Sequence, residues 1–363
     1  MQTEKFKLEI NFLVINRYDS KPLMKYLVSI LFMMLSSVCF SQTAEELYKQ
    51  ATKLDSVKSY KESIKIYSKI IKLNTEEGAA YYGRANAKFN LADSKGALAD
   101  LEMAVTIKKD YSEAFAKRGW IKFTMLDSKG ALADYNTALG FDPRNVDAMC
   151  KRGILYVMMK KYSNAIADFS EALENSPNYF DALLNRGIAR YKFHDYKAAV
   201  SDFNKAQLLD TTNTDIFKYR GNCNLAMKED ASAIADFDKG IEHNQKDPEL
   251  YLNRAAAKLN NGDNQGALDD SNKALALDKK NSMAYNFRGT AKGGLKDYKG
   301  AIADLTIAIK MKQNYSQAYI NRAAVKFASG DKVGSCADLV AADGLGNTMA
   351  NDLIEKYCNH KVK

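Results

Sequence analysis

A basic and an acidic residue at a fixed spacing are the first candidates for chemistry in this chain. In the stretch NRGIARYKFHDYKAAVSDF, residues 185–203, Arg186 precedes Asp202 by sixteen residues. On two facing helices such a pair can work as a catalytic pair, clamp a ligand between its charges, or tie the helices together. The choice among these three roles decides what function the chain can have.

The same pair recurs every 34 residues in eight successive segments, with no insertion or deletion. A catalytic site does not need eight copies, whereas a partly buried arginine needs a partner charge wherever it occurs. The first segment has Gln50 and Ile66 instead, so it has lost both members together, as expected if each pair forms within one segment. We therefore predict structural ion pairs, with guanidinium groups that can also reach the carbonyl groups of a neighbouring turn. The predicted pairs are Arg84–Asp100, Arg118–Asp134, Arg152–Asp168, Arg186–Asp202, Arg220–Asp236, Arg254–Asp270, Arg288–Asp304 and Arg322–Asp338.

Other signatures of catalysis are missing from the sequence. The three histidines, His194, His243 and His360, belong to no HExxH motif, His/Cys cluster or nucleophile triad. The glycine-rich stretch KGGLKDYKG at 292–300 lacks the Lys-Ser/Thr of a phosphate-binding loop, and a loosened turn explains it better. We predict no catalytic residue, no metal site and no cofactor.

The elements that must position these residues are predicted to be helices. Within each 34-residue segment the eighth residue is Gly or Ala, the twentieth is Ala or Ser, and the twenty-fourth is mostly aromatic or Leu. Apolar residues recur at helical spacing in both halves, and small residues allow two helices to approach closely. An aspartate between the halves is suited to cap the second helix. These caps are Asp93, Asp127, Asp195, Asp263, Asp297 and Asp331.

With this register the chain resembles a tetratricopeptide repeat protein. The Ala-x3-Phe pattern of Ala165/Phe169 and Ala199/Phe203 is similar to the signature of the family's second helix, and the segment length also agrees. Arg at the seventh position and Lys or Arg at the eleventh depart from the family pattern. The eleventh-position residues are Lys88, Lys122, Arg190, Lys258 and Lys292.

The expected fold is all-α, an α-solenoid superhelix of nine 34-residue helix-turn-helix repeats followed by a C-terminal capping helix. The nine repeats fill residues 42–349, and residues 350–363 form the cap, with Leu353, Ile354 and Tyr357 turned inward. The repeats are 44–77, 78–111, 112–145, 146–179, 180–213, 214–247, 248–281, 282–315 and 316–349.

The resemblance implies a partner-binding concave face lined by the first helices, at the second, fifth and ninth positions of each repeat. Trp120, the single tryptophan, is either an exposed anchor for a partner or a filler between adjacent first helices. The candidates carried over by position are Tyr82, Asn86, Trp120, Ile154, Leu184, Ile188, Lys218, Asn222, Leu252 and Asn286.

Acidic residues form a row at the second positions of five repeats. The row either complements the dipoles of the first helices or favours a basic peptide. Its members are Glu113, Asp147, Asp181, Asp215 and Glu249. The Lys and Asn clamp with which some members of the family hold a C-terminal carboxylate is not assembled, because Lys218 and Asn222 have no counterpart in the next repeats.

The N-terminal segment has the layout of a secretory signal peptide. Residues 24–41 begin with Met24 and Lys25, continue with an apolar run, and end with a site for cleavage after Ser41. Residues 1–23 fit neither the signal nor the repeats, which suggests disorder or a translation start at Met24. Cys39 raises the alternative of a lipoprotein, but the residues before it fit poorly, and we favour soluble export to the periplasm or the exterior.

Four of the five cysteines remain after cleavage of the signal peptide, and they form no CxxC motif. Cys336 and Cys358 can pair if the C-terminal helix folds back, but we expect four free buried thiols. The net charge of +9 is scattered over the sequence, which argues against a nucleic-acid groove.

The expected function is a non-catalytic scaffold that binds a protein or peptide in the cell envelope or outside the cell, with no stable membrane span once the signal is removed. The alternatives are a component of a nutrient or glycan receptor, a cytoplasmic adaptor, and an enzyme of a type without recognised motifs.

Overall fold

The computed structural model of the protein describes residues 44–358, which are helical and contain no strand. The all-α class and the repeated helix-turn-helix organisation are thereby confirmed. The predicted signal peptide, residues 24–41, and residues 1–23 lie outside the described residues, as do residues 359–363. The chain divides into two compact units between Lys151 and Arg152.

The first helix of each repeat begins 34 residues after the previous one, so the register of the sequence is also the register of the helices. Residues 44–56 are the first helix of the first repeat. The others are α4 (Gly78–Asn90), α6 (Ser112–Thr124), α8 (Val146–Met158), α10 (Phe180–Lys192), α12 (Thr214–Ala226), α14 (Pro248–Asn260), α16 (Ser282–Gly294) and α18 (Ser316–Ala328).

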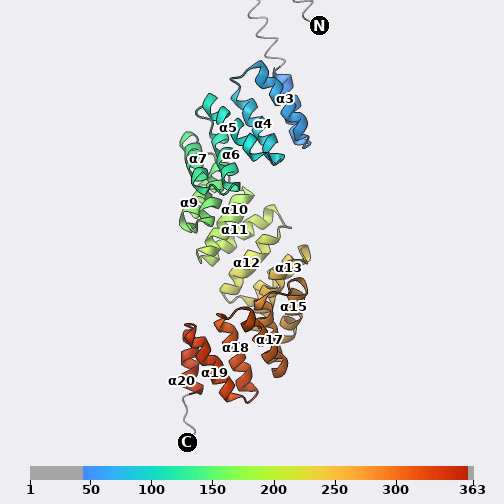
Figure 1. Cartoon of the computed structure of the whole chain (residues 1–363), viewed down its shortest axis with the longest axis vertical. Coiled ribbons are helices and arrows are strands. Elements are labelled where there is room, and N and C mark those ends of the chain that lie inside the picture. Colours follow the sequence, from blue (N-terminus) through green and yellow to red (C-terminus); the bar gives the residue numbers. More distant parts are fainter. Residues whose placement is uncertain (1–43, 359–363) are drawn as a thin grey trace, which may run out of the picture. The chain divides into compact units, whose positions relative to one another are not determined.

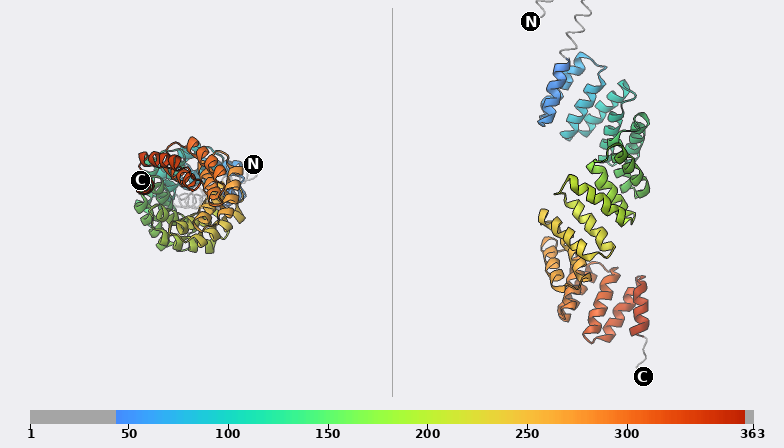
Figure 2. Two further views of the ribbon diagram at one scale, coloured as in Figure 1. Left: turned by 90° about the horizontal axis from the view of Figure 1, so that it is seen from below. Right: turned by 180° about the vertical axis from the view of Figure 1, so that it is seen from behind.

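The second helices alternate with the first helices along the chain. They are α3 (Tyr60–Leu73), α5 (Ser94–Ile107), α7 (Ser128–Phe141), α9 (Tyr162–Asn175), α11 (Tyr196–Leu209), α13 (Asp230–His243), α15 (Asn264–Leu277), α17 (Tyr298–Met311) and α19 (Lys332–Gly344). A last helix, α20 (Thr348–Tyr357), follows the ninth repeat. Within each unit, successive helices pack against one another in chain order (Figures 1 and 2).

Close packing inside a repeat depends on a glycine of the first helix that faces a ring of the second. A Cβ atom at Gly187 would lie 2.6 Å from the ring of Phe203, and the same relation holds for Gly221 and Phe237. Both rings are fully buried. The small eighth residue and the large twenty-fourth residue are therefore two halves of one contact, which is why they occur together.

The predicted helix caps are confirmed. Asp93 accepts a hydrogen bond from the amide nitrogen of Gly96 at 2.8 Å, and the five equivalent aspartates cap their helices in the same way. A Cβ atom at Gly96 would collide with the Asp93 carboxylate. The repeat of Asp195 has Ala198 at that place, and the corresponding bond is longer, 3.3 Å. Glycine after these caps thus permits a shorter bond.

A residue with left-handed backbone conformation connects the two helices of each repeat. Gly262 and Gly330 supply it in two repeats, but Leu126, with φ 68°, adopts it in the third repeat. Its side chain is 87% exposed and gains little from packing. We expect Leu126→Gly to raise the free energy of unfolding by about 0.5–1 kcal/mol, because glycine adopts this conformation without steric cost. Chemical denaturation measures the change, and Leu126→Ala, which keeps a Cβ atom, should give no such gain.

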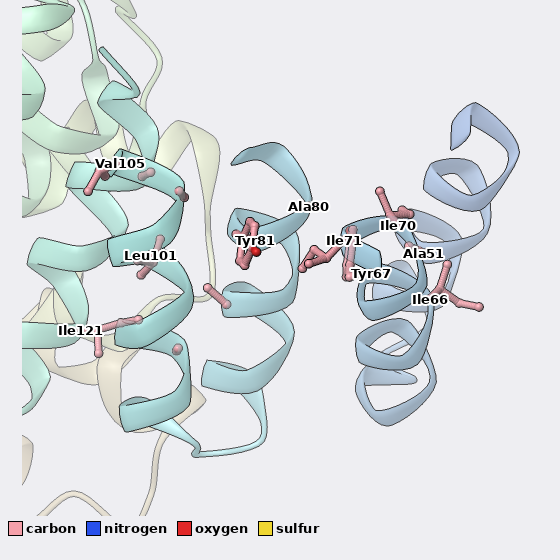
Figure 3. Packing of buried hydrophobic residues seen from close by; sticks show 14 residues of the cluster. Ala51, Ile66, Tyr67, Ile70, Ile71, Ala80, Tyr81, Leu101, Val105 and Ile121 are labelled. Atoms are coloured by element: carbon pink, nitrogen blue, oxygen red, sulfur yellow. The ribbon is translucent and has the colours of Figure 1, made fainter. Parts of the chain in front are cut away.

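The first repeat lacks the Arg/Asp pair and is held by an apolar cluster instead. Ile66 stands where the other repeats have aspartate, and it is 7% exposed. Ile71 of α3 and Tyr81 of α4 belong to the same cluster and lie between these two helices (Figure 3). A packed apolar residue can thus replace an ion pair at this position.

The repeat array ends in α20, which packs on the ninth repeat through Ala350 and the partly buried Leu353. Ile354 is also partly buried. The prediction that Tyr357 turns inward was wrong. Its side chain is 43% exposed and its ring lies 5.1 Å from that of Phe327.

The expectation of four free thiols was also wrong for two of them. Cys336 of α19 and Cys358 at the end of α20 form a disulfide with a Cα–Cα distance of 5.7 Å. Cys150 and Cys223 are buried and belong to no disulfide among the described residues. In earlier repeats an aliphatic side chain such as Val200 or Ile302 stands at the position of Cys336, so the disulfide is particular to the ninth repeat and α20.

Two buried tyrosine hydroxyl groups in the described part of the chain, those of Tyr48 and Tyr135, have no hydrogen-bond partner. Tyr135 of α7 is fully buried, and its Oη makes no hydrogen bond. We expect Tyr135→Phe to raise the free energy of unfolding by about 1 kcal/mol, because the desolvated hydroxyl is removed. Thermal unfolding measures the change. Tyr67→Phe is the matched control and should lower stability instead, because the hydroxyl of Tyr67 donates to Asp55 at 2.9 Å.

Candidate binding face

The Arg/Asp pairs are closed structural ties between the two helices of a repeat. In the repeat of α10 and α11, Arg186 donates through Nε and Nη2 to the two oxygens of Asp202, at 3.0 and 2.7 Å. In all eight pairs the shortest ion-pair distance is between 2.5 and 2.8 Å, and the aspartate side chain is at most 8% exposed. Such groups are not available to a substrate.

Two contacts of these clusters were missed by sequence reasoning. A second cation, four residues after the arginine, contacts the same aspartate, as Arg190 contacts Asp202 at 2.6 Å. Lys88, Lys122, Lys258, Lys292 and Lys326 do the same in their repeats. The third guanidinium nitrogen reaches the preceding repeat, where Arg186 Nη1 donates to Ser170 Oγ at 3.1 Å. Seven of the eight clusters therefore join the two helices of one repeat and the previous second helix. They are those of Arg84, Arg118, Arg186, Arg220, Arg254, Arg288 and Arg322.

The second cation changes the electrostatics of the aspartate. Burial alone would raise the pKa of Asp304, but hydrogen bonds and charges from Arg288 and Lys292 outweigh it, and the pKa is lowered. Burial also raises the pKa of Asp236, where Arg220 and the neutral Asn224 offset only part of the effect. Ionised Asp304 therefore adds stability above the unfolded-state pKa, and this is lost as the pH falls through the folded-state pKa. Folding disfavours the ionisation of Asp236. This residue therefore lowers the stability at pH values above its folded-state pKa, and the penalty disappears as the pH falls below its unfolded-state pKa.

The first helices carry all ten residues predicted to contact a partner. Tyr82, Asn86, Trp120, Ile154, Leu184, Ile188, Lys218 and Asn222 are partly buried. Leu252 and Asn286 are only 2% and 1% exposed. Because these two side chains are enclosed by neighbouring helices, we remove them from the set that can touch a partner directly.

In the first unit this face is aromatic and basic. The rings of Trp120 and Phe123 lie 5.4 Å apart on α6, and Lys151 at the start of α8 lies 5.6 Å from the Trp120 ring. Lys117 lies 4.9 Å from the ring of Phe89 on α4. Trp120 is thus both a contact between adjacent first helices and a partly accessible aromatic surface.

In the second unit the corresponding face carries paired side-chain amides. Asn253 donates to Asn222 Oδ1 at 2.8 Å, and Asn321 donates to Asn286 Oδ1 at 3.0 Å. Lys218 lies among carboxylates, 3.3 Å from Asp215 and 3.6 Å from Glu249. This face is therefore polar but nearly neutral.

The acidic row at the second positions is exposed in all five repeats. Some of its charge is compensated within the protein, since Asp147 pairs with Lys151 at 2.6 Å and Asp215 with Lys218. The second positions therefore present single, partly compensated carboxylates in the first turns of these five helices.

Within residues 44–358, no group of three or more His, Cys, Asp and Glu side chains could hold a metal ion. No helix in this range is both long and apolar enough to cross a membrane.

Comparison with known proteins supports the repeat assignment. Residues 117–179 and 150–215 match the family model described as tetratricopeptide repeat. A search of curated proteins by sequence finds no match.

Solved structures resemble the chain in fold. The Cut9–Hcn1 hetero-tetramer of the APC/C has a TM-score of 0.55 and 15% identity, over 86% of this chain and 76% of that one. The C-terminal part of a TPR protein from Cytophaga hutchinsonii has a TM-score of 0.52 and 21% identity, over 66% and 98%. PilF of Pseudomonas aeruginosa has a TM-score of 0.51 and 18% identity, over 57% and 94%. At these identities the likeness concerns the fold alone.

Proposed function

Because the chain is a tetratricopeptide repeat protein, we propose that it is a non-catalytic scaffold that binds a segment of a partner protein on the face of its first helices. Proteins of this fold serve as interaction scaffolds, since stacked repeats present an extended surface. The observation that carries the proposal is the pair Asn222 and Asn253. One hydrogen bond joins the two side-chain amides. The side-chain NH2 group of Asn222 and the side-chain oxygen of Asn253 make no hydrogen bond in the described part of the chain.

Such a pair can form hydrogen bonds with a polypeptide backbone. A side-chain amide has the same donor and acceptor as a peptide group, and Asn222 and Asn253 are both partly accessible. Leu184 and Ile188 on α10 offer partly buried apolar contacts in the same unit. A segment with alternating backbone and apolar contacts fits these residues better than a sugar or another small ligand, which needs an enclosed pocket.

Crosslinking in the native source followed by direct binding with the purified partner tests the scaffold. We expect a partner that the native chain captures and that a Trp120→Ala, Leu184→Ala variant of equal stability loses. Leu208→Ala is the matched control, because Leu208 lies on the second helix α11 and is 84% exposed. If both variants capture the same proteins as the native chain, the binding face is elsewhere.

We also propose that the protein is exported. The support is the signal-like layout of residues 24–41 together with the disulfide between Cys336 and Cys358, since disulfides persist in oxidising compartments. N-terminal sequencing of the native protein should give Gln42 as the first residue. A native chain that still carries residues 24–41 would overturn cleavage after Ser41 and would leave a cytoplasmic adaptor as an alternative.

A further inference from the structure

Lys117 stands apart from the other partly buried lysines of the first helices. Lys88, Lys122, Lys258, Lys292 and Lys326 contact a buried aspartate, Lys151 contacts Asp147, and Lys218 lies among three carboxylates. Over residues 44–358, Lys117 is the one member of this group with no carboxylate oxygen within 4.0 Å of its ammonium nitrogen.

The surroundings of Lys117 make an uncompensated charge unfavourable. Its ammonium group lies 4.9 Å from the Phe89 ring, which gives only a weak cation–π attraction. Burial lowers the pKa of Lys117, the nearby charge of Lys151 lowers it further, and the carboxylate of Asp147 offsets part of this effect. Because Asp147 forms its ion pair with Lys151, the partly buried Lys117 loses hydration without a direct ion-pair partner of its own. An anionic group from outside the chain would supply that partner.

The same face offers an apolar contact beside the two lysines. Trp120 and Phe123 form an aromatic pair on α6, and Lys151 lies over the Trp120 ring. Because Lys151 lies 5.6 Å from the Trp120 ring, a carboxylate that contacts Lys151 would bring its neighbouring side chain close to this ring. Aromatic residues in such partly buried positions commonly anchor protein partners.

The flanking charges decide between classes of anion. Glu113 in the first turn of α6 is exposed, and the Asp147 side chain is 52% exposed. These carboxylates repel a chain of phosphates or an anionic lipid surface, but they leave room for one anionic group. A protein segment of mixed charge fits this pattern, whereas a polyanion does not.

We propose that Lys117 and Lys151 bind the side-chain carboxylate of an Asp or Glu residue in the partner segment, and that Trp120 and Phe123 contact an apolar residue next to it. This inference rests on the proposed scaffold function and adds the chemistry of one subsite in the first unit. Sequence reasoning missed Lys117 and Lys151 because they stand at the sixth position of their repeats, outside the positions carried over from the family.

Trp120 reports binding directly, because it is the only tryptophan in the chain. The probe is a hexapeptide with an Asp-Phe pair, acetylated and amidated at its ends, titrated into the mature chain while tryptophan fluorescence is measured. We expect saturable binding that weakens about tenfold when Asn replaces Asp in the peptide. Lys117→Met should weaken the Asp peptide by a similar factor, while Lys129→Gln, an exposed lysine on α7, should not.

Two further measurements separate the inference from its alternatives. Lys117→Met should also raise the thermal midpoint without peptide, because an uncompensated charge is removed, and a lower midpoint would assign Lys117 a structural role. Equal binding of the Asp and Asn peptides would overturn the inference, as would preference for an unblocked Asn peptide with a free C-terminus or for an oligodeoxythymidylate. If the peptide tests fail while capture of the crosslinked partner still depends on Trp120 and Leu184, the proposed scaffold function is kept and only the carboxylate subsite is rejected.

Discussion

Replacing Asp202 with alanine is expected to lower the free energy of unfolding by about 3–5 kcal/mol, because the change leaves two cations without their shared counterion. Asp202 is 1% exposed and accepts hydrogen bonds from Arg186 and Arg190. The side chains of Arg186 and Arg190 are only 13% and 21% exposed, so water can replace the lost carboxylate only in part. Urea unfolding followed by circular dichroism measures the loss.

The matched control for this prediction is Glu174→Ala on α9, an exposed acid in the same unit, for which we expect a change of about 0.5 kcal/mol or less. Since repeat arrays unfold in parts, amide hydrogen exchange should place the loss of protection in α10 and α11. Equal midpoints for the two variants would show that the cluster is not a structural tie.

The first repeat suggests how the loss can be reversed. It has Gln50, Leu54 and Ile66 at the three positions that Arg186, Arg190 and Asp202 occupy in the fifth repeat. Ile66 is buried there and needs no counterion. The triple change Arg186→Gln, Arg190→Leu, Asp202→Ile should therefore be more stable than Asp202→Ala alone, because no buried charge remains unpaired. A triple variant no more stable than Asp202→Ala would mean that the arginines are needed for more than the charge of Asp202.

The order of the helices follows from the sequence because every local signal has the same 34-residue period. Small residues, capping aspartates and turn residues such as Pro143 and Pro177 all indicate the same two helices in each repeat. When local preferences and long-range packing agree in this way, the pattern determines the fold class. The second cation at Asp202 has the same period, since Lys or Arg recurs four residues after the arginine in most repeats. The sequence therefore contained the signal for this contact, although the residue departs from the family pattern.

Features that depend on contacts between repeats could not be predicted from the 34-residue pattern. Whether Leu252 and Asn286 are accessible depends on how adjacent first helices pack, and position in the repeat alone does not give this. The unpaired state of Lys117 depends likewise on which side chains of α4 and α8 come near. Repeat periodicity therefore predicts the scaffold well and predicts poorly which of its side chains remain accessible.

Removing the disulfide between Cys336 and Cys358 is expected to destabilise the packed state of α20 by about 3 kcal/mol. This is the loop-closure free energy for a sequence separation of 22 residues. The variant Cys336→Val, Cys358→Ala keeps an aliphatic side chain where the earlier repeats have one. Hydrogen exchange of α20 should become faster, while exchange of α10 remains unchanged.

The faster exchange is expected in α20 alone, because this helix is short and has few apolar contacts with the second unit. It has 10 residues, too few for an isolated helix to be stable in water, and it is the last helix within residues 44–358. Its apolar contacts are the buried Ala350 and the partly buried Leu353 and Ile354, while Tyr357 is exposed. The disulfide at its far end therefore holds in place a helix that covers Ile320 and Ala342, which would otherwise be exposed at the end of the array. Reductant should speed exchange of α20 in the native chain and leave the variant unchanged, and equal exchange of α20 in both would show that packing alone is sufficient.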